Sequence, residues 1–125
     1  MGDSILIVDD TPANLRLLEV LLGIRGYQIR TAPDAEEAMR MIEELPPRLI
    51  LLDLRLPGMD GLELTRRLRS RPATRAILII AVTAQAMRGD EEAAIAAGCD
   101  GFVTKPIDVR SFPDTIARFL AWPTS

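Results

Sequence analysis

Residues 49–53 read Leu49-Ile50-Leu51-Leu52-Asp53, which is four large aliphatic side chains followed directly by a carboxylate. An uninterrupted apolar run of this length is typical of a strand that is buried on both faces, as in a parallel sheet. Similar short runs recur along the chain, and helical patterns fill the gaps between them. The further strand candidates are residues 5–8, 27–31, 77–82 and 101–104.

Five helical patterns alternate with these strands. The first begins near Pro12, carries leucines at helical spacing, and is expected to end at Gly26. The second can be capped by Asp34 and stops before Pro46-Pro47, because proline cannot extend a helix. The third follows Gly61.

The last two helices are predicted over residues 88–97 and roughly 109–121. The start of the last helix stays open between Asp108 and Ser111. Pro113 would break a helix begun at Asp108, whereas the four residues from Ser111 resemble a capping box.

The alternation predicts one α/β domain over residues 1–125, with a core of about 4–121 and no effector domain. Five βα units favour a doubly wound (βα)5 sandwich, a five-stranded parallel sheet with helices on both faces. The flavodoxin-like strand order 2-1-3-4-5 is a common solution for such a chain.

Composition excludes several kinds of chemistry. The chain has 125 residues, a formal net charge of −3, no histidine and a single cysteine, Cys99. A histidine-based triad, a histidine-ligated metal and a cysteine zinc site are therefore impossible within it. Of the fifteen basic residues only Lys105 is a lysine. Any chemistry must use carboxylates, hydroxyls, backbone groups and one amine.

Polar side chains stand where the strong strands end. Asp9-Asp10 follows the first strand, Asp53 ends the third, Thr83 ends the fourth, and the fifth leads into Lys105. Because ligands bind beyond the carboxyl ends of parallel strands, the fold class predicts that these groups share one edge. Any one of them taken alone is more often a turn former or a helix cap, but the coincidence over four strands favours a site.

Three carboxylates in one place repel one another. A dry cluster of them would have to hold protons or a cation. Oxygen ligands without nitrogen or sulfur favour a hard cation, Mg²⁺ above all. The sequence therefore predicts a magnesium site, in which Mn²⁺ could substitute.

The motifs at this edge follow one another in a definite order. They are Asp9-Asp10, then Asp53-Leu54-Arg55-Leu56-Pro57-Gly58-Met59-Asp60-Gly61, then Val82-Thr83-Ala84, and finally Lys105-Pro106. Together they resemble the receiver domain of two-component response regulators, over nearly the whole chain. Residues 86–100 further resemble receivers of the single-domain and hybrid-kinase kinds.

The resemblance implies a phosphoacceptor and its metal site. Asp53 would take a phosphoryl group from the phosphohistidine of a histidine kinase or histidine phosphotransfer protein. Asp9, Asp10, Asp53 and the backbone carbonyl of Arg55 would hold Mg²⁺. Lys105 would contact a phosphoryl oxygen.

The resemblance also implies a switch. Thr83 and the backbone amide of Ala84 would bind the phosphoryl group, and Phe102 would move inward with Thr83. The face formed by the fourth helix, the fifth strand and the fifth helix would then change and signal to a downstream protein. The fourth helix is alanine-rich with Ile95 as its only large apolar anchor, so we expect it to shift at a low cost.

Three further expectations concern single features. The family implies a cis peptide bond at Lys105-Pro106, and it implies that Arg55 and Gln85 tune the lifetime of the acyl phosphate. The basic run from Arg66 to Arg71 is interpreted as a solvated face, because no stacking aromatic interleaves it.

The leading hypothesis is thus a signalling module that catalyses only its own phosphorylation and slow dephosphorylation. Alternatives are a Mg²⁺-dependent aspartyl-phosphate phosphohydrolase and an unphosphorylated scaffold. The hypothesis involves no nucleic-acid contact and no membrane insertion, places the protein in the cytoplasm, and allows a homodimer. It leaves open whether the chain is a stand-alone regulator or part of a hybrid kinase or longer regulator.

Overall fold

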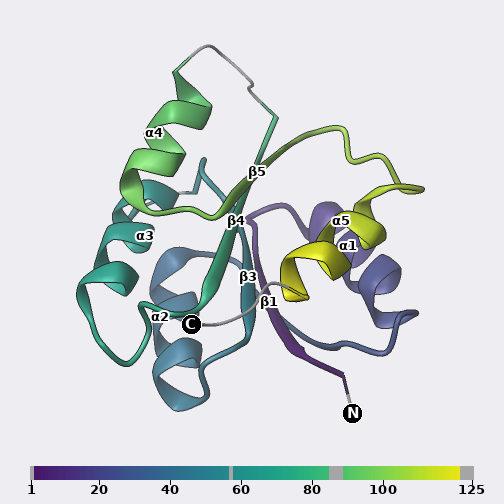
Figure 1. The fold of residues 1–125 in the computed structure, drawn as a ribbon, viewed down its shortest axis with the longest axis horizontal. Coiled ribbons are helices and arrows are strands. Elements are labelled where there is room, and N and C mark those ends of the chain that lie inside the picture. Colours follow the sequence, from purple (N-terminus) through teal and green to yellow (C-terminus); the bar gives the residue numbers. More distant parts are fainter. Residues whose placement is uncertain (1, 57, 85–88, 122–125) are drawn as a thin grey trace.

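The computed structural model describes residues 2–56, 58–84 and 89–121. The chain alternates strictly between strands and helices (Figure 1). The strands are β1 (Ser4–Val8), β2 (Gln28–Ala32), β3 (Leu49–Asp53), β4 (Leu78–Thr83) and β5 (Gly101–Thr104). The helices are α1 (Pro12–Gly23), α2 (Ala35–Glu44), α3 (Gly61–Ser70), α4 (Asp90–Ala97) and α5 (Phe112–Leu120).

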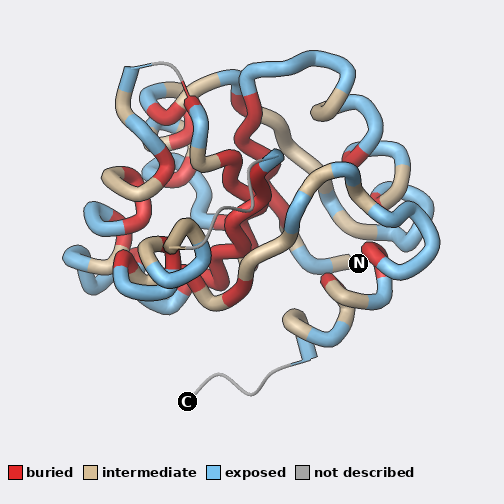
Figure 2. Tube along the Cα trace, turned by 90° about the horizontal axis from the view of Figure 1, so that it is seen from above, coloured by how far each residue is buried: buried red, intermediate tan, exposed pale blue. Residues whose placement is uncertain are grey.

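All strand pairs are parallel, and the sheet order is β2-β1-β3-β4-β5. This confirms the predicted doubly wound, flavodoxin-like sandwich. The helices α2, α3 and α4 lie on one face of the sheet, and α1 and α5 lie on the other (Figure 1). The three central strands are the continuous apolar runs of the sequence, and they are buried along almost their whole length, as Figure 2 shows in red.

Two apolar clusters hold the layers together. On one face, Ile50 and Leu52 of β3 pack with buried side chains of α2, α3 and α4 such as Ile42 and Leu64. On the other face, the alternate β3 residue Leu51 packs in a cluster with α1 and α5. Each fully buried Leu or Ile contributes about 1.5–3 kcal/mol, so β3 anchors both layers.

The first and third helices have boundaries that differ from the prediction. α1 ends at Gly23, and Gly26 lies three residues later in the turn with φ +90°. α3 begins at Gly61 itself, because the side chain of Asp60 accepts a hydrogen bond from the backbone N–H of Glu63 over 2.8 Å and caps the helix. Proline 57 lies outside the described residues.

Of the two starts left open for the last helix, the structure has the one at Ser111, since α5 begins at Phe112, but the capping box expected there does not form. Ser111 precedes α5 in a helical conformation and makes no side-chain cap hydrogen bond. The carboxylate of Asp108 instead accepts a hydrogen bond from the backbone N–H of Arg110 over 2.9 Å, which forms a turn ahead of the helix. Pro113 then falls in the first turn of α5, where a missing N–H costs nothing.

α4 packs differently from the prediction. Its buried side chains are Ala94 and Ala97, whereas Ile95 is 51 % exposed and therefore anchors nothing in the core. α4 begins at Asp90, two residues after the predicted start, and residues 85–88 lie outside the described part. Small buried side chains leave this helix with little apolar burial of its own.

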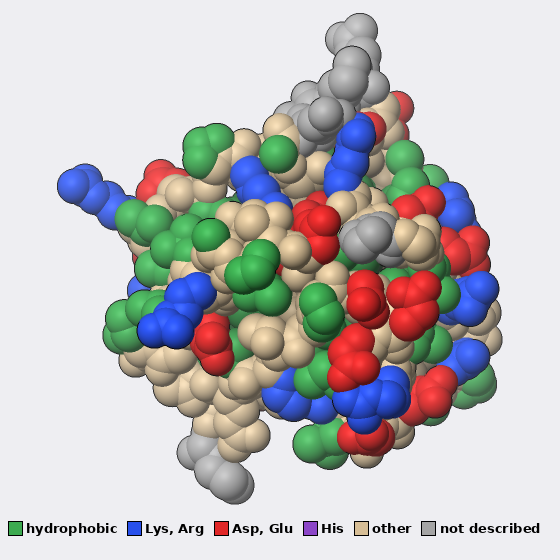
Figure 3. Space-filling view, turned by 180° about the vertical axis from the view of Figure 1, so that it is seen from behind, with side chains coloured by type: hydrophobic (Ala, Val, Ile, Leu, Met, Phe, Trp, Pro, Cys, Tyr) green, Lys and Arg blue, Asp and Glu red, His purple; other side chains and the backbone are tan. Residues whose placement is uncertain are grey.

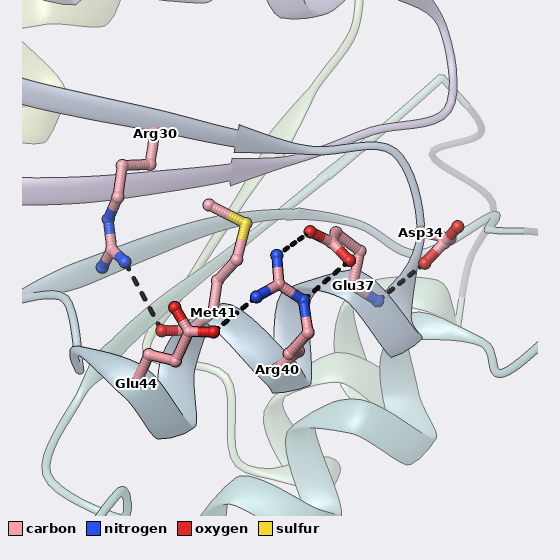
Figure 4. A network of polar contacts seen from close by, with 6 residues as sticks. All are labelled: Arg30, Asp34, Glu37, Arg40, Met41 and Glu44. Carbon is pink, nitrogen blue, oxygen red and sulfur yellow. Dashed lines mark hydrogen bonds and ion pairs between the residues drawn. The ribbon is translucent and has the colours of Figure 1, made fainter.

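Helix α2 carries the predicted cap. The carboxylate of Asp34 accepts from the backbone N–H of Glu37 over 2.8 Å, and Arg40 pairs with both Glu37 and Glu44 along the outer face (Figure 4). Arg30 of β2 reaches the end of this helix and donates to the carbonyl of Met41 over 3.4 Å. These contacts fix the second βα unit at the edge of the sheet.

The outer surface carries both signs of charge. Seen from behind in Figure 3, basic and acidic side chains lie side by side over much of the molecule. Among the described helices, none has the length and hydrophobicity of a membrane-spanning segment.

Candidate functional site

Strands β1 and β3, which are neighbours at the centre of the sheet, bring three carboxylates together at their carboxyl ends. Val8 pairs with Leu52 in the parallel register, so the next residues along each strand, Asp9 and Asp53, are neighbours beyond the carboxyl edge. Asp10 joins them, and one oxygen of each of the three side chains lies within 4.8 Å of the others. The clustering predicted from the fold class is therefore present.

Backbone hydrogen bonds orient the two buried carboxylates. Asp9 is 2 % exposed, and its Oδ1 accepts from the backbone N–H of Thr11 over 2.9 Å. Asp53 is 7 % exposed, and its Oδ1 accepts from the backbone N–H of Arg55 over 2.8 Å. Each turn after the strand thus holds one carboxylate oxygen and turns the other toward the centre of the site.

Lys105, which follows β5 late in the sequence, lies beside the carboxylates. Its Nζ donates to Oδ2 of Asp9 over 2.8 Å and to Oδ2 of Asp53 over 3.4 Å. Burial alone would lower the pKa of Lys105, but the hydrogen bond to Asp9 and the charges of Asp53 and Asp9 outweigh it and raise the pKa above its usual value. The ammonium therefore stays charged. The Lys105–Pro106 peptide bond is cis.

Thr83 stands at the end of β4 beside the carboxylates. It is 2 % exposed, and its carbonyl accepts from the backbone N–H of Lys105 over 2.8 Å, which ties the two strand ends together. Thr83 pairs with Thr104 and Ala81 pairs with Phe102, so Thr83 and Phe102 face the same side of the sheet. Ala84 follows at the exposed rim.

Phe102 is only partly buried. Its ring packs against the cluster under α2, α3 and α4, and it also lines a hollow of about 320 Å³ between β5 and α5. The hollow has further walls from Val103, Thr115, Arg118 and Phe119.

The rim of the site holds one of the two predicted lifetime positions. The side chain of Arg55 is exposed and borders a hollow of about 190 Å³ that runs from α3 to α4. Gln85 lies outside the described residues. The same hollow is lined by Leu54, Asp60, Leu62, Thr83, Asp90 and Ala93.

The donor set fits a hard divalent cation. Three carboxylate oxygens converge, two from buried side chains and one from the exposed Asp10, and among the described residues no sulfur or nitrogen ligand accompanies them. This is the ligand chemistry that Mg²⁺ prefers, with room on the exposed side for the waters that it retains. The single ammonium of Lys105 offsets only part of the negative charge.

Two features, one beside the site and one at the other end of the sheet, were not predicted from the sequence. The ideal Cβ position of Gly61 lies 2.9 Å from the carbonyl oxygen of Asp53, so only glycine lets α3 start this close to the end of β3. Arg69 is not part of a solvated face, because its guanidinium bonds carbonyls and Asp100 at the opposite end of the sheet. An aspartate directly before a strand was the only sequence signal for that contact.

The family model of the response regulator receiver domain matches residues 5–117. The chain belongs to this family. Receiver domains are signalling modules of two-component systems, and they interact with histidine kinases or phosphotransfer proteins and with downstream effectors.

Several relatives of this receiver domain match it over nearly full length. The polar-differentiation response regulator DivK of Brucella anthropi is 40% identical over 120 residues, which cover 96% of this chain and 98% of that protein. A putative response regulator from Chloroflexus aurantiacus superposes with a TM-score of 0.93 at 32% identity, covering 98% of this chain and 100% of that one.

A third similar structure bears on the metal. The receiver domain of the sensor histidine kinase PA1611 from Pseudomonas aeruginosa superposes with a TM-score of 0.89 at 34% identity, covering 98% of this chain and 100% of that one. That structure has a magnesium ion coordinated in its active site cleft. Receiver domains bind Mg²⁺ at an acidic pocket, and this receiver domain has a cluster of three aspartates, Asp9, Asp10 and Asp53.

Proposed function

We propose that Asp53 is the phosphoacceptor of this receiver domain and takes its phosphoryl group from a phosphohistidine on a kinase or phosphotransfer protein. The observation that carries the proposal is the convergence of Asp9, Asp10 and Asp53 on one point, with Lys105 beside them. Asp53 is the carboxylate that lies between the other strand ends, next to both β1 and β4.

The transfer is a displacement at phosphorus. A carboxylate oxygen of Asp53 forms the new P–O bond, and the P–N bond to the donor imidazole breaks. The electron pair of that bond returns to the imidazole nitrogen, which takes up a proton and leaves as neutral histidine. Such a step needs alignment and charge neutralisation more than covalent machinery.

Asp9, Asp10, Asp53 and the backbone carbonyl of Arg55 would hold Mg²⁺. The bound cation offsets the negative charge that builds up between carboxylate and phosphoryl oxygens. The backbone N–H of Arg55 already fixes Oδ1 of Asp53, so the acceptor is oriented before the donor arrives.

Lys105 and Thr83 would respond to the new group. Lys105 donates to a phosphoryl oxygen, while the hydroxyl of Thr83 and the backbone amide of Ala84 bind another. Phe102 faces the same side of the sheet as Thr83, so a movement of Thr83 changes the packing space of the ring. The face of α4, β5 and α5 would then carry the signal to a partner protein. Arg55 and Gln85 would set how slowly the acyl phosphate hydrolyses.

Phosphotransfer to purified protein tests this assignment. A phosphorylated histidine phosphotransfer protein plus Mg²⁺ should add one phosphate per chain by intact mass, and the Asp53→Asn variant should add none. Asp34→Asn is the matched control, since Asp34 caps α2 and asparagine caps a helix equally well. A normal phosphate yield in Asp53→Asn would show that the acceptor is misassigned. Many turnovers on small phosphate esters would indicate a phosphohydrolase, and no phosphate in the wild type would indicate a scaffold.

A further inference from the structure

Arg69, in the last turn of α3, bonds two other segments, the α3–β4 connection and the α4–β5 turn, at the end of the sheet opposite the aspartate cluster. Its Nε donates to the carbonyl of Gly98 over 2.8 Å, and its Nη1 donates to the carbonyls of Arg75 and Ile77 over 2.7 and 2.6 Å. Its Nη2 donates to Oδ2 of Asp100 over 2.7 Å. We call this set of contacts the Arg69 clamp.

The clamp holds the C-terminal end of α4. Gly98, which ends α4 with φ +116°, lies so close that an added Cβ would meet Cγ of Arg69 at 2.7 Å. Asp100 is also bound to β4, since the same Oδ2 accepts from the N–H of Ile79 over 2.8 Å and the N–H of Asp100 donates to the carbonyl of Ile79 over 2.7 Å. The turn from α4 into β5 is thus fixed from two directions.

The N-terminal end of α4 is built differently. Gly89 precedes the helix with φ +103°, and within the described part of the chain no heavy atom lies within 4 Å of its ideal Cβ position. Asp90 and Ala93 border the hollow of about 190 Å³ that Thr83 and Arg55 also line. The buried side chains of α4, Ala94 and Ala97, both lie in its second half.

We propose that Arg69 is a positioning residue of the switch: it fixes the C-terminal end of α4, so that the displacement following phosphorylation occurs at the N-terminal end, over the hollow beside Thr83. This inference rests on the proposed function of Asp53. On this proposal α4 tilts about its fixed C-terminal end, and the helix as a whole neither shifts along its axis nor unfolds.

An arginine is required at this position. Four acceptors surround the guanidinium, and three of them are carbonyls, two from the α3–β4 connection and one from the α4–β5 turn. The planar fork of arginine presents five N–H donors in fixed directions, whereas a lysine ammonium offers three from one point. Arg69→Lys keeps the charge and removes the simultaneous contacts.

Cys99 can serve as a probe for opening of the turn at the C-terminal end of α4. Cys99, the only cysteine, lies between Gly98 and Asp100, is 6 % exposed, and has its Sγ 3.7 Å from Oγ1 of Thr65 on α3. A maleimide can label it only after the turn opens, so the labelling rate reports the opening of this end. Amide exchange of residues 90–93, followed by NMR, reports the other end.

The experiment compares Arg69→Lys with Arg67→Ala, with and without Mg²⁺ and beryllium trifluoride, a phosphoryl mimic. Arg67 lies on the exposed side of the same helix and pairs only with Glu63 among the contacts described, so it is the matched control. In the wild type and the control, the mimic should change exchange at residues 90–93 about fivefold or more, while Cys99 labelling changes less than about twofold. In Arg69→Lys, both ends should respond, and basal labelling should rise about tenfold.

Uniform loss of stability would raise exchange and labelling everywhere, but it would not move the response to the mimic from one end of α4 to both. Asp100→Asn, which keeps an acceptor for Ile79 but loses the charge, should give the same shift if Arg69→Lys does not fold. The proposal is overturned if Cys99 labelling in the wild type responds as strongly as residues 90–93, or if Arg69→Lys behaves like Arg67→Ala. If the mimic does not bind at all, the proposed function of Asp53 fails. The Arg69 clamp is then tested by basal labelling of Cys99 alone. Faster labelling in Arg69→Lys than in Arg67→Ala would support the clamp, and equal rates would overturn the clamp.

Discussion

The ammonium of Lys105 lies closer to Asp9 than to Asp53, at 2.8 Å against 3.4 Å. The only lysine of the chain is thus held mainly by a carboxylate that we assign to the metal, and only secondarily by the proposed acceptor. A cation at the three aspartates and an ammonium at Asp9 compete for the same oxygen atoms. Binding of Mg²⁺ is therefore expected to release Lys105 toward Asp53.

Lys105→Met should separate these two roles. Removing the ammonium leaves two buried carboxylates without a counter-charge, so in EDTA the free energy of unfolding should fall by about 2–3 kcal/mol. The variant should bind Mg²⁺ more tightly than the wild type and regain stability with added Mg²⁺, because a ligand of the folded state stabilises it. Urea unfolding with and without Mg²⁺ measures both effects. Lys105→Arg, which keeps the charge, should lose less stability but still transfer phosphate poorly. Equal Mg²⁺ affinity in Lys105→Met and wild type would contradict the competition.

Thr83→Ala should separate phosphorylation from its consequence. The acceptor and the metal ligands are untouched, so the phosphate yield should match the wild type, whereas amide exchange at residues 90–93 should no longer respond. The lost buried contacts cost about 1–2 kcal/mol. Thr83→Ser retains the hydroxyl and serves as the control, which should keep the response. A full response in Thr83→Ala would remove Thr83 from the switch.

Gly61→Ala should damage the acceptor through the backbone. The new Cβ would lie 2.9 Å from the carbonyl oxygen of Asp53 and from Cα of Leu54, and backbone atoms cannot move aside cheaply. We expect a loss of about 2–3 kcal/mol and slower phosphotransfer. Gly23→Ala is the matched control, because no atom of the described residues lies within 4 Å of its ideal Cβ, and it should stabilise α1 by about 0.5–1 kcal/mol. Thermal unfolding measures the stability of both variants. Equal changes in stability would show that the close contact at Gly61 does not matter.

Cys99 should make stability depend on alkaline pH. Burial raises the pKa of the Cys99 thiol above its usual 9.0, and the hydrogen bond to Thr65 and the charge of Arg69 reduce this rise without cancelling it. Above about pH 9 the thiol loses its proton in the unfolded chain but keeps it in the folded protein. The contribution of Cys99 to the free energy of unfolding is therefore complete below about pH 9 and declines as the pH rises toward the pKa of the folded state. Wild type should lose up to about 1.4 kcal/mol more per pH unit than Cys99→Ala in this window. Denaturant titrations between about pH 8 and 10 give the free energy of unfolding at each pH. If it falls with pH equally in wild type and Cys99→Ala, the contribution of Cys99 is ruled out.

Much of the fold was predictable because apolar runs and strand ends are local properties of the sequence. The run Leu49–Leu52 identifies a doubly buried strand, and the parallel arrangement then fixes where Asp9 and Asp53 must meet. The aspartate cluster follows from topology, without any knowledge of side-chain geometry.

Other features depend on contacts that a linear pattern does not contain. Arg69 lies in a run of exposed arginines and differs from them because its neighbours in space are three carbonyls from two separate connections of the chain. Ile95 has the right hydrophobicity for a core anchor but the wrong direction from α4. At Ser111 the local sequence allows a capping box, but Asp108, three residues earlier, forms the turn instead.

The bond between Lys105 and Asp9 joins residues 96 positions apart, so nearly the entire chain must be made and folded before it can form. During synthesis the strand that bears Asp9 emerges long before the one that precedes Lys105. A nascent or truncated chain that ends before β5 would expose the aspartates without their ammonium, and their mutual repulsion would oppose closure of the cluster. If the proposed function holds, the phosphoacceptor site would therefore be complete only after β5 has been made and has joined the sheet.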